Sequence, residues 1–150
     1  MSSHFPNTAM HRRRPGSMIS MTLKTGANPQ HIKARVLSCA PMMPGVYLLW
    51  VQAPAIAAIA RPGQFAMLKC GGSAFLRRPL SVHRISPSRT DVAFLFAAIG
   101  KGTDWLSGSK PGNILDVLGP MGNGFNILPT SSELLLVAGG LGIAPLVFLA

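Results

Sequence analysis

Acidic residues are scarce in this sequence, and none occurs before Asp91. The 150-residue chain has 4 acidic and 14 basic side chains, which gives a formal net charge of +10. A basic surface is typical of proteins that bind nucleic acid. The basic residues are not interleaved with aromatic side chains, however, and no zinc-finger, helix-turn-helix or RNA-binding signature is present. Nucleic-acid binding is therefore kept only as a less favoured alternative.

Cysteine is almost as scarce. Cys39 and Cys70 are the only two, and neither has a neighbouring Cys or a paired His. A structural zinc site or an iron–sulfur cluster needs about four such ligands, so we predict no metal site from these residues. We expect two reduced, buried thiols in a cytoplasmic protein. No residue pattern predicts a catalytic nucleophile, acid or base.

Long uninterrupted hydrophobic runs are also lacking. The apolar run 46–60 contains Gln52 and Pro54, and the run 134–150 contains three glycines and Pro145. A membrane-spanning helix needs about 20 predominantly apolar residues in succession. The sequence therefore predicts no membrane span.

The first 30 residues differ in composition from the rest of the chain. They contain Arg12, Arg13 and Arg14 among scattered Ser, Asn and Thr, without apolar periodicity. This composition predicts a disordered basic tail over 1–30. It loosely fits an organellar transit peptide, whereas a start codon assigned too far upstream is the simpler explanation.

From His31 onward, short apolar segments alternate with turn-forming residues. This spacing predicts a mainly β domain, either an antiparallel sandwich or a barrel. One helical stretch is expected before the end, with Thr103 as its cap, Trp105 and Leu106 facing inward, and Gly108 at its end. The expected strands are 32–39, 46–53, 64–70, 78–85, 92–98 and 114–118.

A different pattern follows Pro129. The continuous apolar run 134–138 is typical of a strand buried on both faces, and a glycine turn and a new helix come directly after it. That order predicts the opening of a strand-turn-helix unit in a parallel sheet. A complete βαβ unit needs about 30 residues, so the unit predicted over 133–150 is incomplete.

Two of four candidate binding motifs lie near the predicted strands 78–85 and 92–98. In the first, the guanidinium fork of Arg78 suits a pyrophosphate, although an edge strand with solvated arginines explains this motif better when it is taken alone. In the second, glycines let the backbone approach an anion at the start of the predicted helix, and a plain strand-to-helix turn is the alternative. The candidate residues are Arg78, Pro79, Leu80, Ser81, Gly100, Lys101, Gly102 and Thr103.

Two glycine motifs follow them. Residues 119–125 form a rigid loop whose Gly and Asn residues permit positive φ angles. Residues 139–145 come directly after the predicted strand, where glycines allow a tight turn close to a dinucleotide pyrophosphate. Pro145 stands where the last glycine of the usual G-x-G-x-x-G spacing would be. We predict that Gly139, Gly140 and Gly142 contact a nicotinamide dinucleotide.

In this order, and with Arg61-Pro62-Gly63-Gln64-Phe65 before the third predicted strand, the motifs resemble those of the ferredoxin-reductase-type flavoproteins. The closest resemblance is to the branch of dihydroorotate dehydrogenase electron transfer subunits. It covers 31–150. It implies a six-stranded antiparallel Greek-key barrel that binds FAD over 31–128, followed by the first strand and turn of a truncated α/β nucleotide-binding domain over 133–150.

The resemblance also implies roles for single residues. It places Arg78 on the FAD pyrophosphate, Ser81 near the reactive edge of the isoalloxazine ring, and Gly102 and Thr103 on the phosphates. Leu80 stands where the wider superfamily usually has an aromatic residue stacked on the flavin, as is often the case in the dihydroorotate branch.

In the family, NADH reduces the flavin, and the flavin passes single electrons to a [2Fe-2S] cluster and on to a catalytic dihydroorotate dehydrogenase subunit of pyrimidine biosynthesis. The cluster's cysteines and most of the NAD(P) site fall outside this sequence. Two alternatives stay open: a reductase subunit of a hydrogenase or sulfide dehydrogenase, and a truncated flavin-binding fragment without complete activity. On the strand of the first motif, His83 is expected to be a satisfied or solvent-facing histidine rather than a proton relay.

Overall fold

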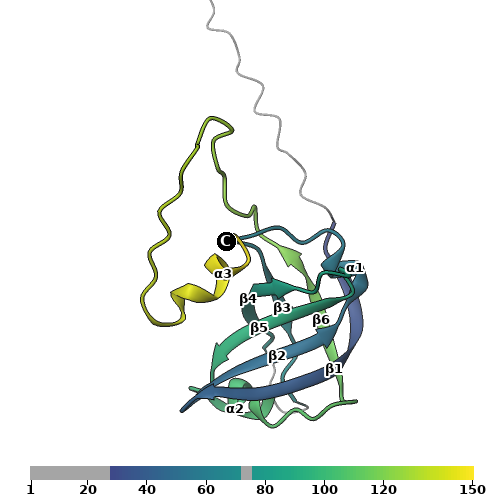
Figure 1. Cartoon of the computed structure of the whole chain (residues 1–150). Helices are drawn as coiled ribbons and strands as arrows, with labels where there is room; N and C mark the ends of the chain where they lie inside the picture. Colours follow the sequence, from purple (N-terminus) through teal and green to yellow (C-terminus); the bar gives the residue numbers. More distant parts are fainter. Residues whose placement is uncertain (1–27, 72–75) are drawn as a thin grey trace, which may run out of the picture.

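The computed structural model describes residues 28–71 and 76–150. Within these ranges six antiparallel strands close into a barrel in the order β1-β2-β5-β4-β3-β6 (Figure 1). The prediction of a six-stranded antiparallel Greek-key barrel is confirmed. The expected basic tail lies outside the described residues, apart from its last three. The strands are β1 (Gln30–Met43), β2 (Val46–Gln52), β3 (Phe65–Leu68), β4 (Arg78–Ile85), β5 (Asp91–Ala97) and β6 (Ile114–Met121).

The first strand is longer than the sequence predicts. The strand was expected over 32–39, yet β1 continues to Met43, and Pro41 is paired with Tyr47 of β2. A register shift follows Pro41 in this pair. Proline is tolerated where a strand carries such an irregularity, because its missing N–H costs no regular ladder bond there. The chain reverses at Gly45, whose φ of 74° a side chain would disfavour.

One continuous apolar core fills the barrel. Every second residue of a strand points inward, so Val36 and Leu49 are buried while their neighbours face outward. A short helix that the sequence did not predict, α1 (Pro54–Ala57), adds Ile56 to this core. It begins at a proline, which is favoured in the first turn of a helix because the missing N–H has no partner there anyway.

The predicted helix after the fifth strand is α2 (Lys101–Ser107). Its N-cap is Gly100 rather than the predicted Thr103. Leu106 is fully buried as predicted, but Trp105 is 48% exposed, and the prediction that it faces inward is wrong. Successive helical residues are about 100° apart around the axis, so Leu106 faces the core while Trp105 lies to its side. Trp105 instead lies beside Gly71.

The apolar run 134–138 forms no strand in this structure, which contradicts the prediction of a buried one. Leu135 is 90% exposed. A strand is defined by hydrogen bonds to a neighbour, and none of the barrel strands pairs with this run. After it the chain returns to the barrel through a 3₁₀ turn, η1 (Gly140–Gly142), and α3 (Ile143–Val147), which packs on β4 and β5 (Figure 1). No helix in the described ranges is long and apolar enough to cross a membrane.

Candidate cofactor site

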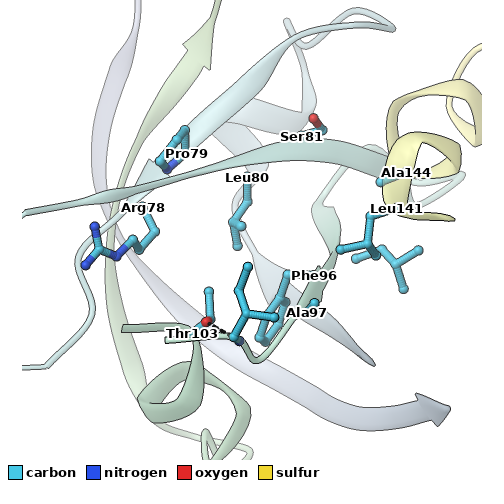
Figure 2. A pocket seen from close by; sticks show the side chains of 11 residues that line it. Arg78, Pro79, Leu80, Ser81, Phe96, Ala97, Thr103, Leu141 and Ala144 are labelled. Carbon is cyan, nitrogen blue, oxygen red and sulfur yellow. Dashed lines mark hydrogen bonds between the residues drawn. The ribbon is translucent and has the colours of Figure 1, made fainter. Parts of the chain in front are cut away.

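A pocket of about 300 Å³ opens between the barrel and the C-terminal segment (Figure 2). This volume is at the lower end of the range for small-molecule sites, roughly 300–1,000 Å³. Four parts of the chain line it: β4, the end of β5, the start of α2 and the segment around η1. The lining residues are Arg78, Pro79, Leu80, Ser81, Leu95, Phe96, Ala97, Ile99, Thr103, Leu141 and Ala144.

Arg78 supplies the positive charge of the pocket. It opens β4, is half-buried, and forms no salt bridge with any residue that the structure describes. Its side chain crosses Gly102 closely, because a Cβ atom at Gly102 would lie only 2.7 Å from Nε of Arg78. Gly102 thus leaves the space that the guanidinium stem occupies. The first two sequence motifs are in direct contact here.

The neighbouring Arg77 has a different environment. Its guanidinium pairs with the carboxylate of Asp116 on β6, to which Lys33 and His31 of β1 also bind, at 2.9 Å and 2.8 Å. Burial raises the pKa of Asp116, but the hydrogen bonds from Lys33, Arg77 and His31 outweigh it, and the pKa lies well below its usual range. The alternative of solvated arginines is therefore wrong for Arg77, whose guanidinium is paired with a carboxylate of β6.

The side chains of the first motif alternate across β4. Arg78 and Leu80 lie on one face of the strand, and Pro79 and Ser81 on the other (Figure 2). Leu80 is directed into the pocket toward Phe96, so apolar groups occupy its centre. Ser81 borders the pocket from the far face of the strand, at the end away from Arg78.

The hydroxyl of Thr103 is occupied by the backbone before the helix. It accepts hydrogen bonds from the N–H groups of Ile99 (3.1 Å) and Gly100 (3.2 Å) and donates one to the carbonyl of Gly100 (3.0 Å). Thr103 therefore shapes the turn that carries Gly102 to Arg78. Lys101 is exposed and does not line the pocket.

The motif 119–125 packs against the residues before β3 rather than against the pocket. Gln64 is 5% exposed, accepts a hydrogen bond from the Arg61 N–H at 2.9 Å, and donates one to the Gly122 carbonyl at 2.7 Å. The two backbones approach so closely that a Cβ at Gly63 would meet the Phe125 nitrogen at 2.7 Å. The residues before β3 and the motif 119–125 thus hold each other in place and have a structural role. A lone Gln at the edge of an apolar segment was the only sequence signal for it.

His83 connects the barrel to the C-terminal motif. It is 6% exposed, and its Nδ1 lies 2.9 Å from the carbonyl oxygen of Ala144. Burial lowers the pKa of His83 and nearby Arg84 lowers it further, whereas the hydrogen bond to Ala144 opposes both. His83 is thus a satisfied buried histidine, as the sequence favoured.

The C-terminal motif meets the pocket through residues that the sequence did not single out. Leu141 and Ala144 line it, whereas nothing lies within 4 Å of a Cβ placed at Gly139, Gly140 or Gly142. A positive φ of 53° at Gly140 shapes the turn.

The described residues offer no metal centre. No group of three or more His, Cys, Asp or Glu side chains among them is arranged to hold an ion. Cys39 and Cys70 are free, and burial raises the pKa of both thiols, although Arg78 partly offsets this for Cys70.

The curated relatives of this chain include electron transfer subunits of dihydroorotate dehydrogenase B (NAD(+)). An electron transfer subunit of dihydroorotate dehydrogenase B (NAD(+)) from Desulforamulus reducens is 43% identical over 118 residues, which cover 77% of this chain and 45% of the relative. The chain thus spans under half the length of this curated relative. No protein-family model matches the chain.

Solved structures agree on the fold. The structure of an NADH-dependent reduced ferredoxin-NADP oxidoreductase is 30% identical, with a TM-score of 0.58 over 63% of this chain and 34% of that one. The ferredoxin reductase of carbazole 1,9a-dioxygenase has a TM-score of 0.70 at 21% identity, over 79% of this chain and 38% of that one. The barrel therefore has the fold of the ferredoxin-reductase-type FAD-binding domains.

Proposed function

We propose that the chain is the FAD-binding part of an electron transfer subunit of the dihydroorotate dehydrogenase B kind, and that the pocket beside Arg78 holds the flavin. The observation that carries this proposal is the position of Arg78, which forms no salt bridge with any described residue and lies across Gly102 at the edge of an apolar pocket. The 43% identical relative supports the choice of subunit.

The residues present fit FAD. The half-buried guanidinium of Arg78 is not neutralised by a carboxylate in the described chain, so it is available for a bidentate contact to a pyrophosphate. Leu80 and Phe96 give the ring an apolar surface. The space at Gly102 keeps the guanidinium in place. In this proposal Thr103 acts through the turn, and Ser81 lies at the ring end of the pocket.

When bound, FAD supplies the conversion of a two-electron hydride donor to single-electron transfer. The residues of this chain bind the cofactor, orient it and exclude water from it. We propose NAD(P)H as the donor and a [2Fe-2S] cluster with a catalytic dihydroorotate dehydrogenase subunit as the acceptors, which places the complex in pyrimidine biosynthesis. The names of the curated relatives support this wider role, and the two free thiols suit the reducing cytoplasm.

The test is FAD binding to the full 150-residue chain and to Arg78→Gln, measured by titration of flavin fluorescence. Gln keeps a polar side chain but removes the charge, and a hydrogen bond to a charged group contributes about 1.5–3 kcal/mol, so we expect affinity to fall roughly 10- to 100-fold. The matched control is Arg84→Gln, since Arg84 is exposed on the same strand and does not line the pocket. An unchanged chain that does not bind FAD, or an Arg78→Gln variant that binds it equally well, refutes the proposal.

A further inference from the structure

One wall of the pocket comes from outside the barrel. Leu141 and Ala144 line the pocket beyond Ser81, at the end opposite Arg78 (Figure 2). They belong to η1 and α3, which follow the exposed, irregular stretch 122–139. The segment that joins the wall to the barrel has no helix or strand, so it does little to fix the position of the wall.

Among the described residues, His83 makes the side-chain hydrogen bond that joins this wall to the barrel. Ala144 is 4% exposed, and its carbonyl oxygen lies 2.9 Å from Nδ1 of His83. A carbonyl only accepts hydrogen bonds, so Nδ1 carries the proton and donates. Backbone packing adds to this bond, because α3 lies against β4 and β5, η1 lies against β5, and Phe148 packs against the core.

His83 lies at an irregular point of β4, on the part of the strand that the C-terminal segment covers. The pairing of β4 with β5 has a register shift between Val82 and Arg84, and His83 lies at that irregularity. Val82 belongs to the buried core of the barrel, whereas His83 is buried where α3 packs on β4. Arg84, the next residue, is exposed.

We propose that His83 is a positioning residue for the flavin: its Nδ1–H holds the carbonyl of Ala144 and so keeps Leu141 and Ala144 as the wall that shields the ring end of the pocket from water. The inference rests on the proposed function, because it assumes that the pocket holds a flavin. In this proposal the motif 139–145 closes the flavin pocket, in addition to its predicted contact with a nicotinamide dinucleotide.

The experiment compares two substitutions in the full chain. His83→Leu is similar in size but has no donor, whereas Asn in His83→Asn carries a side-chain N–H close to the position of Nδ1. Bound-flavin fluorescence is quenched with iodide, which measures access to the ring, and FAD affinity is titrated. We expect several-fold stronger quenching and about tenfold weaker binding for His83→Leu. His83→Asn is expected to restore most of both, and Arg84→Gln serves as the control.

A third variant keeps the test valid if His83→Leu does not fold. Leu141→Ala removes a 39% exposed side chain of the wall without touching the hydrogen bond, and it too should increase quenching by iodide. Equal quenching in the unchanged chain and in Leu141→Ala overturns the role of the wall. Equal iodide quenching and equal FAD affinity in His83→Leu and His83→Asn overturn the role of the hydrogen bond.

Amide hydrogen exchange separates this inference from the proposed function. The backbone N–H groups of Leu149 and Ala150 bond to Leu146 within the docked segment, and they should exchange faster in His83→Leu even without flavin. Unchanged exchange refutes the positioning role. An unchanged chain that protects these amides but does not bind FAD refutes the proposed function and the shielding of a flavin, while the contact between His83 and the segment stands.

Discussion

Gly102 is the residue whose smallness most directly affects the candidate site. Its absent side chain leaves the space through which Arg78 passes, because a Cβ there would come within 2.7 Å of Nε and 3.2 Å of Cγ of Arg78. A glycine inside a helix is destabilising by roughly 1 kcal/mol relative to alanine. Gly102 therefore destabilises α2 but allows the Arg78 side chain to reach the pocket.

We therefore predict that Gly102→Ala weakens FAD binding by about tenfold while the chain stays folded, because the guanidinium is displaced from the pocket but alanine favours the helix. Flavin fluorescence titration measures the affinity, and thermal unfolding measures the stability. The control is Gly108→Ala at the end of the same helix, where a Cβ would make only an ordinary contact of 3.5 Å. Affinity that is unchanged in Gly102→Ala would show that Arg78 does not depend on this space.

At the scale of single residues, the sequence motifs indicate which residues are candidates for binding, but they do not predict which groups these residues contact. Arg78 could be named from its motif, but nothing in the sequence distinguished it from Arg77, whose charge is neutralised by Asp116 far along the chain. Leu141 and Ala144 were missed because they reach the pocket only through the return of the chain to β4 and β5. Such contacts depend on the tertiary fold and leave no local pattern.

At the scale of elements, the strands were predictable and the exceptions have physical reasons. Alternating apolar residues between turn formers marked all six strands, because the barrel has one buried and one exposed face. The helix α1 was missed because its apolar residues continue the run from β2 and it spans only four positions. The strand expected over 134–138 is absent because pairing, rather than composition, makes a strand.

The ion-pair network at Asp116 is a property of elements, since it joins β1, β6 and Arg77, the residue before β4. We predict that Asp116→Asn lowers the free energy of unfolding at pH 7 by about 1–2 kcal/mol, a modest value because two of the three partners are largely exposed. Chemical denaturation at pH 7 measures this difference.

The pH dependence follows from the direction of the shift. The pKa of Asp116 is lower in the folded chain than in the unfolded chain, so its contribution is complete above about pH 4 and is lost as the pH falls further. The stability of the unchanged chain and that of Asp116→Asn should therefore converge in acid. Asp91→Asn is the control, because the Asp91 side chain forms no ion pair with the described residues. A constant difference between pH 7 and pH 3 contradicts the assignment.

At the scale of the whole molecule, the described residues form a closed barrel, and the segment 133–150, predicted to begin a nucleotide-binding unit, adds no strand to a sheet. A dinucleotide binds beside the carboxyl ends of parallel strands, where a glycine turn leads into a helix. In the described chain the run 134–138 lies outside any sheet, and Gly139, Gly140 and Gly142 have open space around them. The segment instead packs on the barrel through α3 and lines the candidate pocket.

A polypeptide of these 150 residues should bind FAD, but NADH should not reduce the bound flavin. The candidate flavin pocket is lined by the barrel, the start of α2 and the short segment around η1 and α3, whereas a dinucleotide needs paired parallel strands that the described residues do not form. The measurement is the flavin absorbance band under anaerobic conditions: addition of NADH should leave it unchanged, and dithionite should then bleach it, which shows that the bound flavin is reducible. Rapid bleaching by NADH alone would mean that the turn from Gly139 to Gly142 and the barrel together suffice to hold a nicotinamide against the ring.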